Sequence, residues 1–217
     1  MSGKMQVVFA KQTGHVLTAF TRTADPEGKV KVGESGGGLL VRHLRSVTTA
    51  SQSIMPGLLS LTATVPAEAL DSAVVDFHPA VFVAPRRFVV GGGEVAELGA
   101  NTVDLGTAKP LPVPPLPPAT NHSPLVNLNT VRATVQIESA ATEDKGVCIV
   151  LQEAAPSPGD EIERRIAQGA IPQGEHFVSL DWKTSPDGSP ASVSGGRGYT
   201  LFVLIAGYQP LFGVALL

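Results

Sequence analysis

The chain has 217 residues, of which 43% are hydrophobic and 16% charged, and its net charge is −3. It is too apolar for a disordered chain, and it lacks the basic excess of a general nucleic-acid binder. The single cysteine excludes an internal disulfide and a cysteine-based zinc cluster. Abundant valine favours strands over helices, so a β-rich globular protein is expected.

Short strands separated by turns are predicted throughout the first half. Residues 59–65 alternate apolar and polar side chains, which is typical of a half-buried strand. The sequence Asp-Pro-Glu-Gly at 25–28 predicts a tight turn, and one helical turn is expected at 66–70. The predicted strands are residues 5–10, 15–23, 29–32, 39–47, 59–65, 73–77, 80–84 and 87–90.

A proline-rich segment divides the chain near its middle. Six of the ten residues 109–118 are proline, which favours an extended polyproline II spacer. We therefore expect an N-terminal β domain at 1–106, a linker at 107–119 and a C-terminal β-sandwich domain at 120–217. Proteolysis under native conditions is predicted to cut near residues 106–122 and to release two folded halves. The same segment also matches the K-x-x-P-x-x-P pattern of ligands for SH3-type domains. A further alternative is that it lies along the surface of a neighbouring protein.

The second half repeats this pattern of strands and turns. Residues 147–151 are apolar on both faces, which indicates a central strand. A short helix is predicted at 158–168, where Pro158 follows a possible serine cap and Ile162 and Ile166 are four residues apart. The other predicted strands are residues 131–137, 175–182, 199–206 and 211–217.

Targeting and membrane signals are weak. The apolar stretch at 7–10 is too short for a signal peptide. Residues 199–217 carry no charge, so a tail anchor is the alternative to two strands, but Gly207, Pro210 and Gly213 disfavour a helix. The predicted fold is all-β: two small antiparallel β-sandwich or barrel-like domains joined by a proline-rich polyproline II linker, with at most one or two short helices.

Two glycine-rich segments resemble catalytic or cofactor motifs. Residues 33–37 match G-x-S-x-G around Ser35, but too little sequence precedes them for either family of serine hydrolases that uses this pattern. Residues 91–96 match G-x-G-x-x-A, but Gly99 follows before a phosphate-binding helix could form. We expect both segments to be loops, and we assign no catalytic or cofactor-binding residue.

The remaining reactive side chains also favour structural roles. The histidines (His15, His43, His78, His122 and His176) have no metal-ligand spacing, so no metal site is expected. Cys148 lies in an apolar strand and is expected in the core. The mixed-charge cluster from Asp160 to Arg165 is interpreted as a solvated helix face, with a subunit contact as the alternative.

These features favour a non-enzymatic structural or assembly subunit of a larger complex, acting through protein–protein contacts between β domains. Self-association or other protein subunits are the expected partners, with no nucleic acid, membrane or cofactor. In general character the profile resembles subunits of phage-derived or phage-tail-like particles, although no motif identifies a family. The expected location is the cytoplasm, or a particle assembled there.

Two alternatives remain. One is a monomeric β-sandwich module that recognises a protein, peptide or glycan through the loops 33–38, 91–93 and 185–198. The other is an enzyme that uses Ser35 or an unrecognised metal site.

Overall fold

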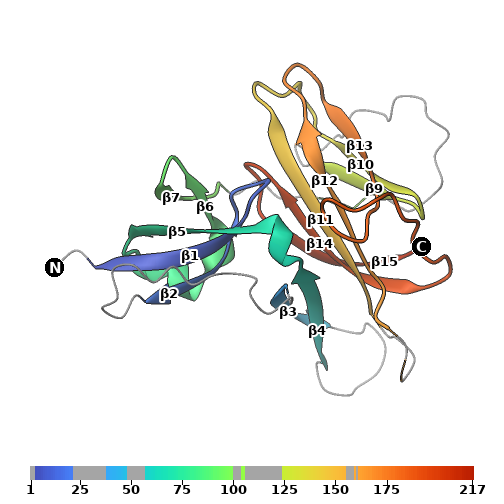
Figure 1. The fold of residues 1–217 in the computed structure, drawn as a ribbon, viewed down its shortest axis with the longest axis horizontal. Coiled ribbons are helices and arrows are strands. Elements are labelled where there is room, and N and C mark those ends of the chain that lie inside the picture. Colours follow the sequence, from blue (N-terminus) through green and yellow to red (C-terminus); the bar gives the residue numbers. More distant parts are fainter. Residues whose placement is uncertain are drawn as a thin grey trace.

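The computed structural model describes residues 3–21, 38–47, 57–99, 104–105, 124–154, 159 and 161–217. Strands dominate these residues, as predicted, and they form one three-stranded sheet, two four-stranded sheets and two hairpins (Figure 1). The described strands close no barrel. Within these described ranges, helical structure is limited to α1 (Pro79–Val83) and the 3-10 turns η1 (Ala67–Ala69) and η2 (Pro85–Arg87).

The N-terminal sheet has β1 (Lys4–Ala10) at its centre, between β2 (Val16–Thr21) and β5 (Leu70–Asp76). Both pairings are antiparallel. One face packs against α1 and the hairpin of β6 (Phe88–Gly91) and β7 (Glu94–Glu97). This first core contains Met5, Val7, Val16, Val75, Val81 and Phe88.

Strands β3 (Leu39–Val47) and β4 (Gly57–Val65) form a separate two-stranded ribbon. An isolated hairpin is marginally stable in water, so the ribbon needs a surface on which to bury its apolar face. The alternation predicted for residues 59–65 supplies that face, because Leu61, Ala63 and Val65 are all buried. The ribbon packs against the second half of the chain rather than standing alone.

Two further sheets of four strands, which we call the β10 sheet and the β11 sheet, are built mainly from the second half of the chain. In the β10 sheet the order is β13 (Phe177–Asp181), β10 (Arg132–Gln136), β9 (Leu125–Leu128) and β8 (Asp104–Leu105). Only the β8–β9 pair is parallel. In the β11 sheet the order is β12 (Arg164–Ile171), β11 (Lys145–Glu153), β14 (Gly198–Ile205) and β15 (Leu211–Leu216), all antiparallel.

A hydrophobic core lies between these two sheets. It includes Val135 from the β10 sheet, and Ile149 and Leu201 from the β11 sheet. The buried Trp182 donates its indole N–H to the backbone oxygen of Asn129 at 2.8 Å, which satisfies its one polar atom. On one side the sheets are joined, because Ile166 and Lys183 exchange two backbone hydrogen bonds of 2.9 Å. The central position predicted for residues 147–151 is confirmed by β11.

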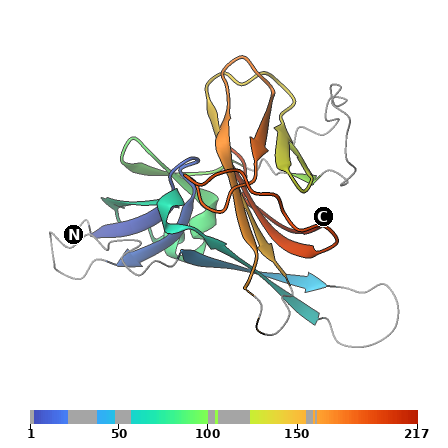
Figure 2. The same cartoon turned by 45° about the vertical axis from the view of Figure 1, so that its right-hand side comes forward.

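The opposite face of the β11 sheet is also buried, beneath residues from the first half of the chain. Figure 2 shows the β3–β4 ribbon lying along this sheet. Polar bonds cross the same contact: the backbone N–H of Thr64 donates to the Gln152 side chain at 3.0 Å, and the Gln12 side chain donates to the Gly169 backbone at 2.8 Å. This second core contains Val8, Ala10, Leu17, Val41, Leu61, Ala63, Val65, Ala69, Leu70, Cys148, Val150, Ile166, Phe202, Leu204 and Phe212.

The second core therefore joins residues on both sides of the proline-rich segment. Strand β8, which precedes that segment, also lies in the β10 sheet. The linker at 107–119 is outside the described residues, and the domain boundaries 1–106 and 120–217 stay a prediction.

Two local predictions were wrong. Residues 80–84 were expected to form a strand, but Pro79 lies at the first position of α1, where its fixed φ favours a helical turn. The helix predicted at 158–168 is contradicted where the chain is described, because β12 begins at Arg164. Ile166 lies opposite Val150 of β11, so pairing with that long strand outweighs the local helical spacing. The turn at 25–28 and the strand at 29–32 lie outside the described residues.

The uncharged stretch 199–217 forms β14 and β15, joined by a turn at 206–210, as predicted. No helix in the described part of the chain has the length and apolar character needed to cross a membrane.

Candidate protein-interaction edge

The glycine segment at 91–93 forms the turn of the β6–β7 hairpin. Gly92 and Gly93 have φ values of 60° and 85°, the left-handed region that glycine adopts readily. Strand β7 begins at Glu94, where a dinucleotide site would require a helix, so the segment is a tight turn as expected. Ser35 and His122 lie outside the described residues.

The four described histidines each have a different environment. His15 is buried, His43 stacks on Phe212 with ring centroids 5.3 Å apart, and His176 is exposed. His78 is also exposed and lies beside Phe88. Within the described ranges, no three metal-ligating side chains of the His, Cys, Asp and Glu types gather in one place.

Cys148 is fully buried, as expected for a core residue. Burial raises the pKa of its thiol to about 11, although a contact from the Gln168 amide to Sγ at 3.3 Å acts in the opposite direction. The thiolate is the reactive form of cysteine, so this residue is a poor nucleophile.

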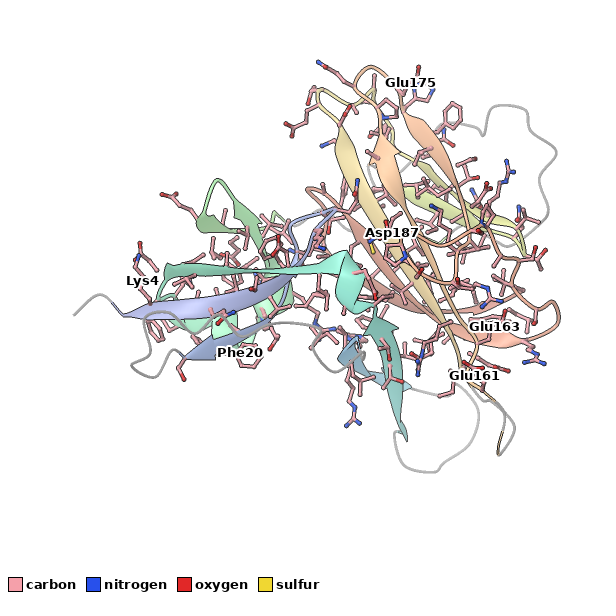
Figure 3. The ribbon with its side chains drawn as sticks, viewed as in Figure 1. Lys4, Phe20, Glu161, Glu163, Glu175 and Asp187 are labelled. Atoms are coloured by element: carbon pink, nitrogen blue, oxygen red, sulfur yellow. The ribbon has the colours of Figure 1, made fainter. Side chains whose placement is uncertain are left out.

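The charged cluster before β12 is not a solvated helix face, at least for Glu163 and Arg165. Their side chains are 10% and 19% exposed, and they form an ion pair of 2.8 Å. The carboxylate of Glu163, whose side chain is labelled in Figure 3, also accepts a 2.7 Å hydrogen bond from the Tyr199 hydroxyl and one from the Ser194 backbone N–H. Burial alone would raise the pKa of Glu163, but these partners hold it below its usual value. Glu163 and Arg165 are therefore held in a network of contacts within the chain.

Strand β15 has a different character, because it is an end strand of the β11 sheet. It pairs with β14 on one side, and the described chain supplies no strand for its other side. Its sequence, Leu-Phe-Gly-Val-Ala-Leu, contains no charged residue and no proline. Val214 and Leu216 are 52% and 73% exposed on this strand.

The exposed pair continues a row that begins in the second core. Phe212, Val214 and Leu216 alternate along β15 and so share one face of the sheet. Phe212 is buried between Phe202, at a centroid distance of 4.3 Å, and His43. The row is therefore anchored at one end and open to solvent at the other.

The open end of β15 is nevertheless held in place by backbone bonds. Leu217 and Arg197 exchange two backbone hydrogen bonds of 3.2 Å, so the strand remains paired with β14 to its last residue. A strand that is fixed along one side presents its free backbone groups in a regular row, which is the arrangement needed to accept another strand.

Sequence reasoning predicted the strand at 211–217 but not its position at the edge. Comparison with known proteins adds no assignment, because no family model, curated protein or solved structure matches the chain.

Proposed function

We propose that this protein is a non-enzymatic assembly subunit that joins a second copy of itself by adding strand β15 to the corresponding strand of that copy. The observation that carries this proposal is the uncharged edge of β15, which has no strand partner among the described residues, with Val214 and Leu216 exposed. Antiparallel pairing of two β15 strands would make a symmetric contact, in which each copy offers the same surface.

The physical support is that the described residues show none of the usual protection of an edge strand on β15. Natural end strands are blunted by charged side chains, proline, bulges or a covering segment, because unpaired N–H and C=O groups otherwise recruit other chains. The described part of β15 carries neither a charge nor a proline. A partner strand would satisfy these backbone groups and cover the two apolar side chains at the same time.

The alternative of a loop-based binding module has less support. The backbone N–H of Ala191 donates to Trp182, and that of Val193 donates to Thr130, both at 2.7 Å. Residues 185–198 are thus tied to the protein body rather than presented as a free loop. The turn at 91–93 is tight, and residues 33–37 are outside the described chain.

The test is the mass of the full-length protein in solution across a hundredfold dilution, by light scattering. The wild-type protein is expected to form a discrete oligomer, and Leu216→Lys is expected to shift it to monomer because a charge at the contact must lose its water. Val131→Lys is the matched control, since Val131 is 49% exposed but lies beside β10.

Two results would contradict the proposal. One is a wild-type monomer at every concentration, and the other is an oligomer that Leu216→Lys and Val214→Lys both leave intact. Unchanged circular dichroism of the variants would show that the fold survives, because both side chains are already exposed.

A further inference from the structure

A groove with a volume of about 390 Å³ lies between β2, β3 and the segment from α1 to η2. Its apolar lining includes Leu17 from β2, Val41 from β3, Val83 from α1 and Pro85 from η2. Leu40 and Val83 also line the groove and are 56% and 87% exposed, so two large apolar side chains project into solvent at its rim. The lining of the groove does not include Phe212, Val214 or Leu216, the residues of the row on β15 described above.

Three arginines line the same groove, and the described lining residues include no carboxylate. Arg87 already has a partner, since its guanidinium lies 3.0 Å from Glu97. No carboxylate among the described residues pairs with Arg42 or Arg86. The groove therefore presents two positive charges that the described chain does not neutralise.

Arg86 is held in place and partly removed from water. Its guanidinium carbon lies 5.3 Å from the centre of the Phe212 ring, in a cation–π contact. Burial lowers its pKa, which reflects the cost of keeping this charge away from solvent. A partly desolvated guanidinium binds a carboxylate more strongly than a solvated one does, because water competes less for its donors.

The strands that border the groove suit an extended ligand. Both β2 and β3 are end strands of their sheets, so each has a row of backbone groups without a strand partner in those sheets. A peptide in β conformation can bond to such groups while its side chains alternate between the groove and solvent.

We propose that this groove binds an acidic, extended segment of a partner protein, whose carboxylates pair with Arg42 and Arg86 and whose apolar side chains pack on Leu40 and Val83. Nucleic acid fits less well, because the described lining contains no aromatic side chain for base stacking and the chain carries a net charge of −3. The segment must alternate acidic and apolar residues to meet both parts of the lining.

The test uses an environment-sensitive dye on Thr18→Cys, because Thr18 lines the groove and the buried Cys148 is protected from labelling. The probe is a peptide of alternating glutamate and valine, and its matched control has lysine in place of glutamate. Saturable fluorescence change with the acidic peptide alone is expected. A dye on Val131→Cys should not respond, because Val131 is not part of the groove lining.

Two variants test the assigned contacts. Arg42→Gln and Arg86→Gln are each expected to weaken binding roughly tenfold, the effect of losing one charge-assisted hydrogen bond. Arg132→Gln is the control, since Arg132 pairs with Asp181 in the β10 sheet. If Arg86→Gln disturbs folding through the loss of its contact with Phe212, the test rests on Arg42→Gln. Arg42 is exposed, so its substitution should change peptide binding without disturbing the fold.

The proposal is overturned if the acidic peptide fails to bind at millimolar concentration, if both peptides bind equally, or if Arg42→Gln binds as tightly as the wild-type protein. Leu216→Lys should bind the acidic peptide normally, so failure of this site and failure of the β15 contact are distinguishable.

Discussion

The Nε2 atom of His15 donates a hydrogen bond of 2.8 Å to the backbone oxygen of Tyr208, which joins the turn before β2 to the turn after β14. A carbonyl oxygen only accepts, so Nε2 carries the ring proton. The Nδ1 atom then accepts from the hydroxyl of Thr13 at 2.9 Å. The buried ring is fully bonded at a contact between the two halves of the chain, and its lowered pKa of about 4 keeps it neutral at pH 7.

This histidine predicts a loss of stability in mild acid. Burial lowers the pKa of His15 to about 4, while the backbone contact to Tyr208 acts against this shift. Between pH 6.5 and 4 the unfolded state binds a proton that the folded state does not, so the free energy of unfolding falls as the pH falls. The expected loss is about 3 kcal/mol across this window.

Urea unfolding at pH 7 and pH 4.5 measures this effect. His15→Gln cannot titrate and should show a smaller difference between the two pH values, although it is less stable at pH 7. Equal pH dependence in the variant and the wild-type protein would mean that His15 does not contribute to acid sensitivity.

Gly146 allows the turn after β1 to lie close to β11. A Cβ atom built at this position would overlap the backbone carbonyl of Gln12, which is not a flexible group. Gly146→Ala should therefore lower the free energy of unfolding by about 1–3 kcal/mol. Gly198→Ala, in the same sheet with open space around its Cβ, should change it by less than about 0.5 kcal/mol. If thermal unfolding showed the same loss of stability for Gly146→Ala and Gly198→Ala, the close approach of the Gln12 carbonyl to Gly146 would be contradicted.

The Tyr199 hydroxyl stabilises the buried carboxylate of Glu163. Its hydrogen atom is shared between Glu163 at 2.7 Å and the Ser194 backbone oxygen at 2.9 Å. Tyr199→Phe should lower the free energy of unfolding by about 2 kcal/mol, since a buried charged acceptor loses a donor. The control is Thr134→Val, which removes an exposed 3.0 Å bond to Ser179 and should have little effect in chemical denaturation. If Tyr199→Phe left the free energy of unfolding unchanged, the remaining donors to the Glu163 carboxylate would be sufficient to stabilise it.

The second core predicts how the two halves behave when separated. A fragment of residues 120–217 would expose the face of the β11 sheet that contains Cys148 and Phe202. We expect its thiol to react readily with a thiol reagent, whereas the thiol of the full chain resists modification. A protein cut within 107–119 should keep both fragments together on gel filtration, with Cys148 still protected. Free separation of the cut fragments would show that this core is too weak to hold them.

Strands with a clear local pattern were predictable. Residues 59–65 alternate because one face of β4 is buried, and residues 147–151 are apolar throughout because β11 is covered on both faces. The helix expected at 158–168 failed because Ile162 and Ile166 also fit a strand, and only the long-range pairing with β11 decides between the two. Local spacing carries no information about that partner.

The candidate sites were less accessible to sequence reasoning. The strand at 211–217 was recognised, but its place at the edge depends on the strand order of the whole sheet. Arg42 and Arg86 lie in different elements, and nothing in their local sequence indicates that they border one groove. Both surfaces arise from tertiary arrangement rather than from a motif.

The two-sided burial of the β11 sheet also has a consequence during synthesis on the ribosome. Leu61, Ala63 and Val65 of β4 are made before β11 and β14, the strands that later cover them. Until those strands emerge, the ribbon can pack only against the members of this core from the first half of the chain, such as Val8 and Leu17, and the part of its apolar face that stays exposed is open to aggregation. The nascent chain is therefore expected to need a chaperone at this stage, and to complete its second core only after the proline-rich segment has been translated.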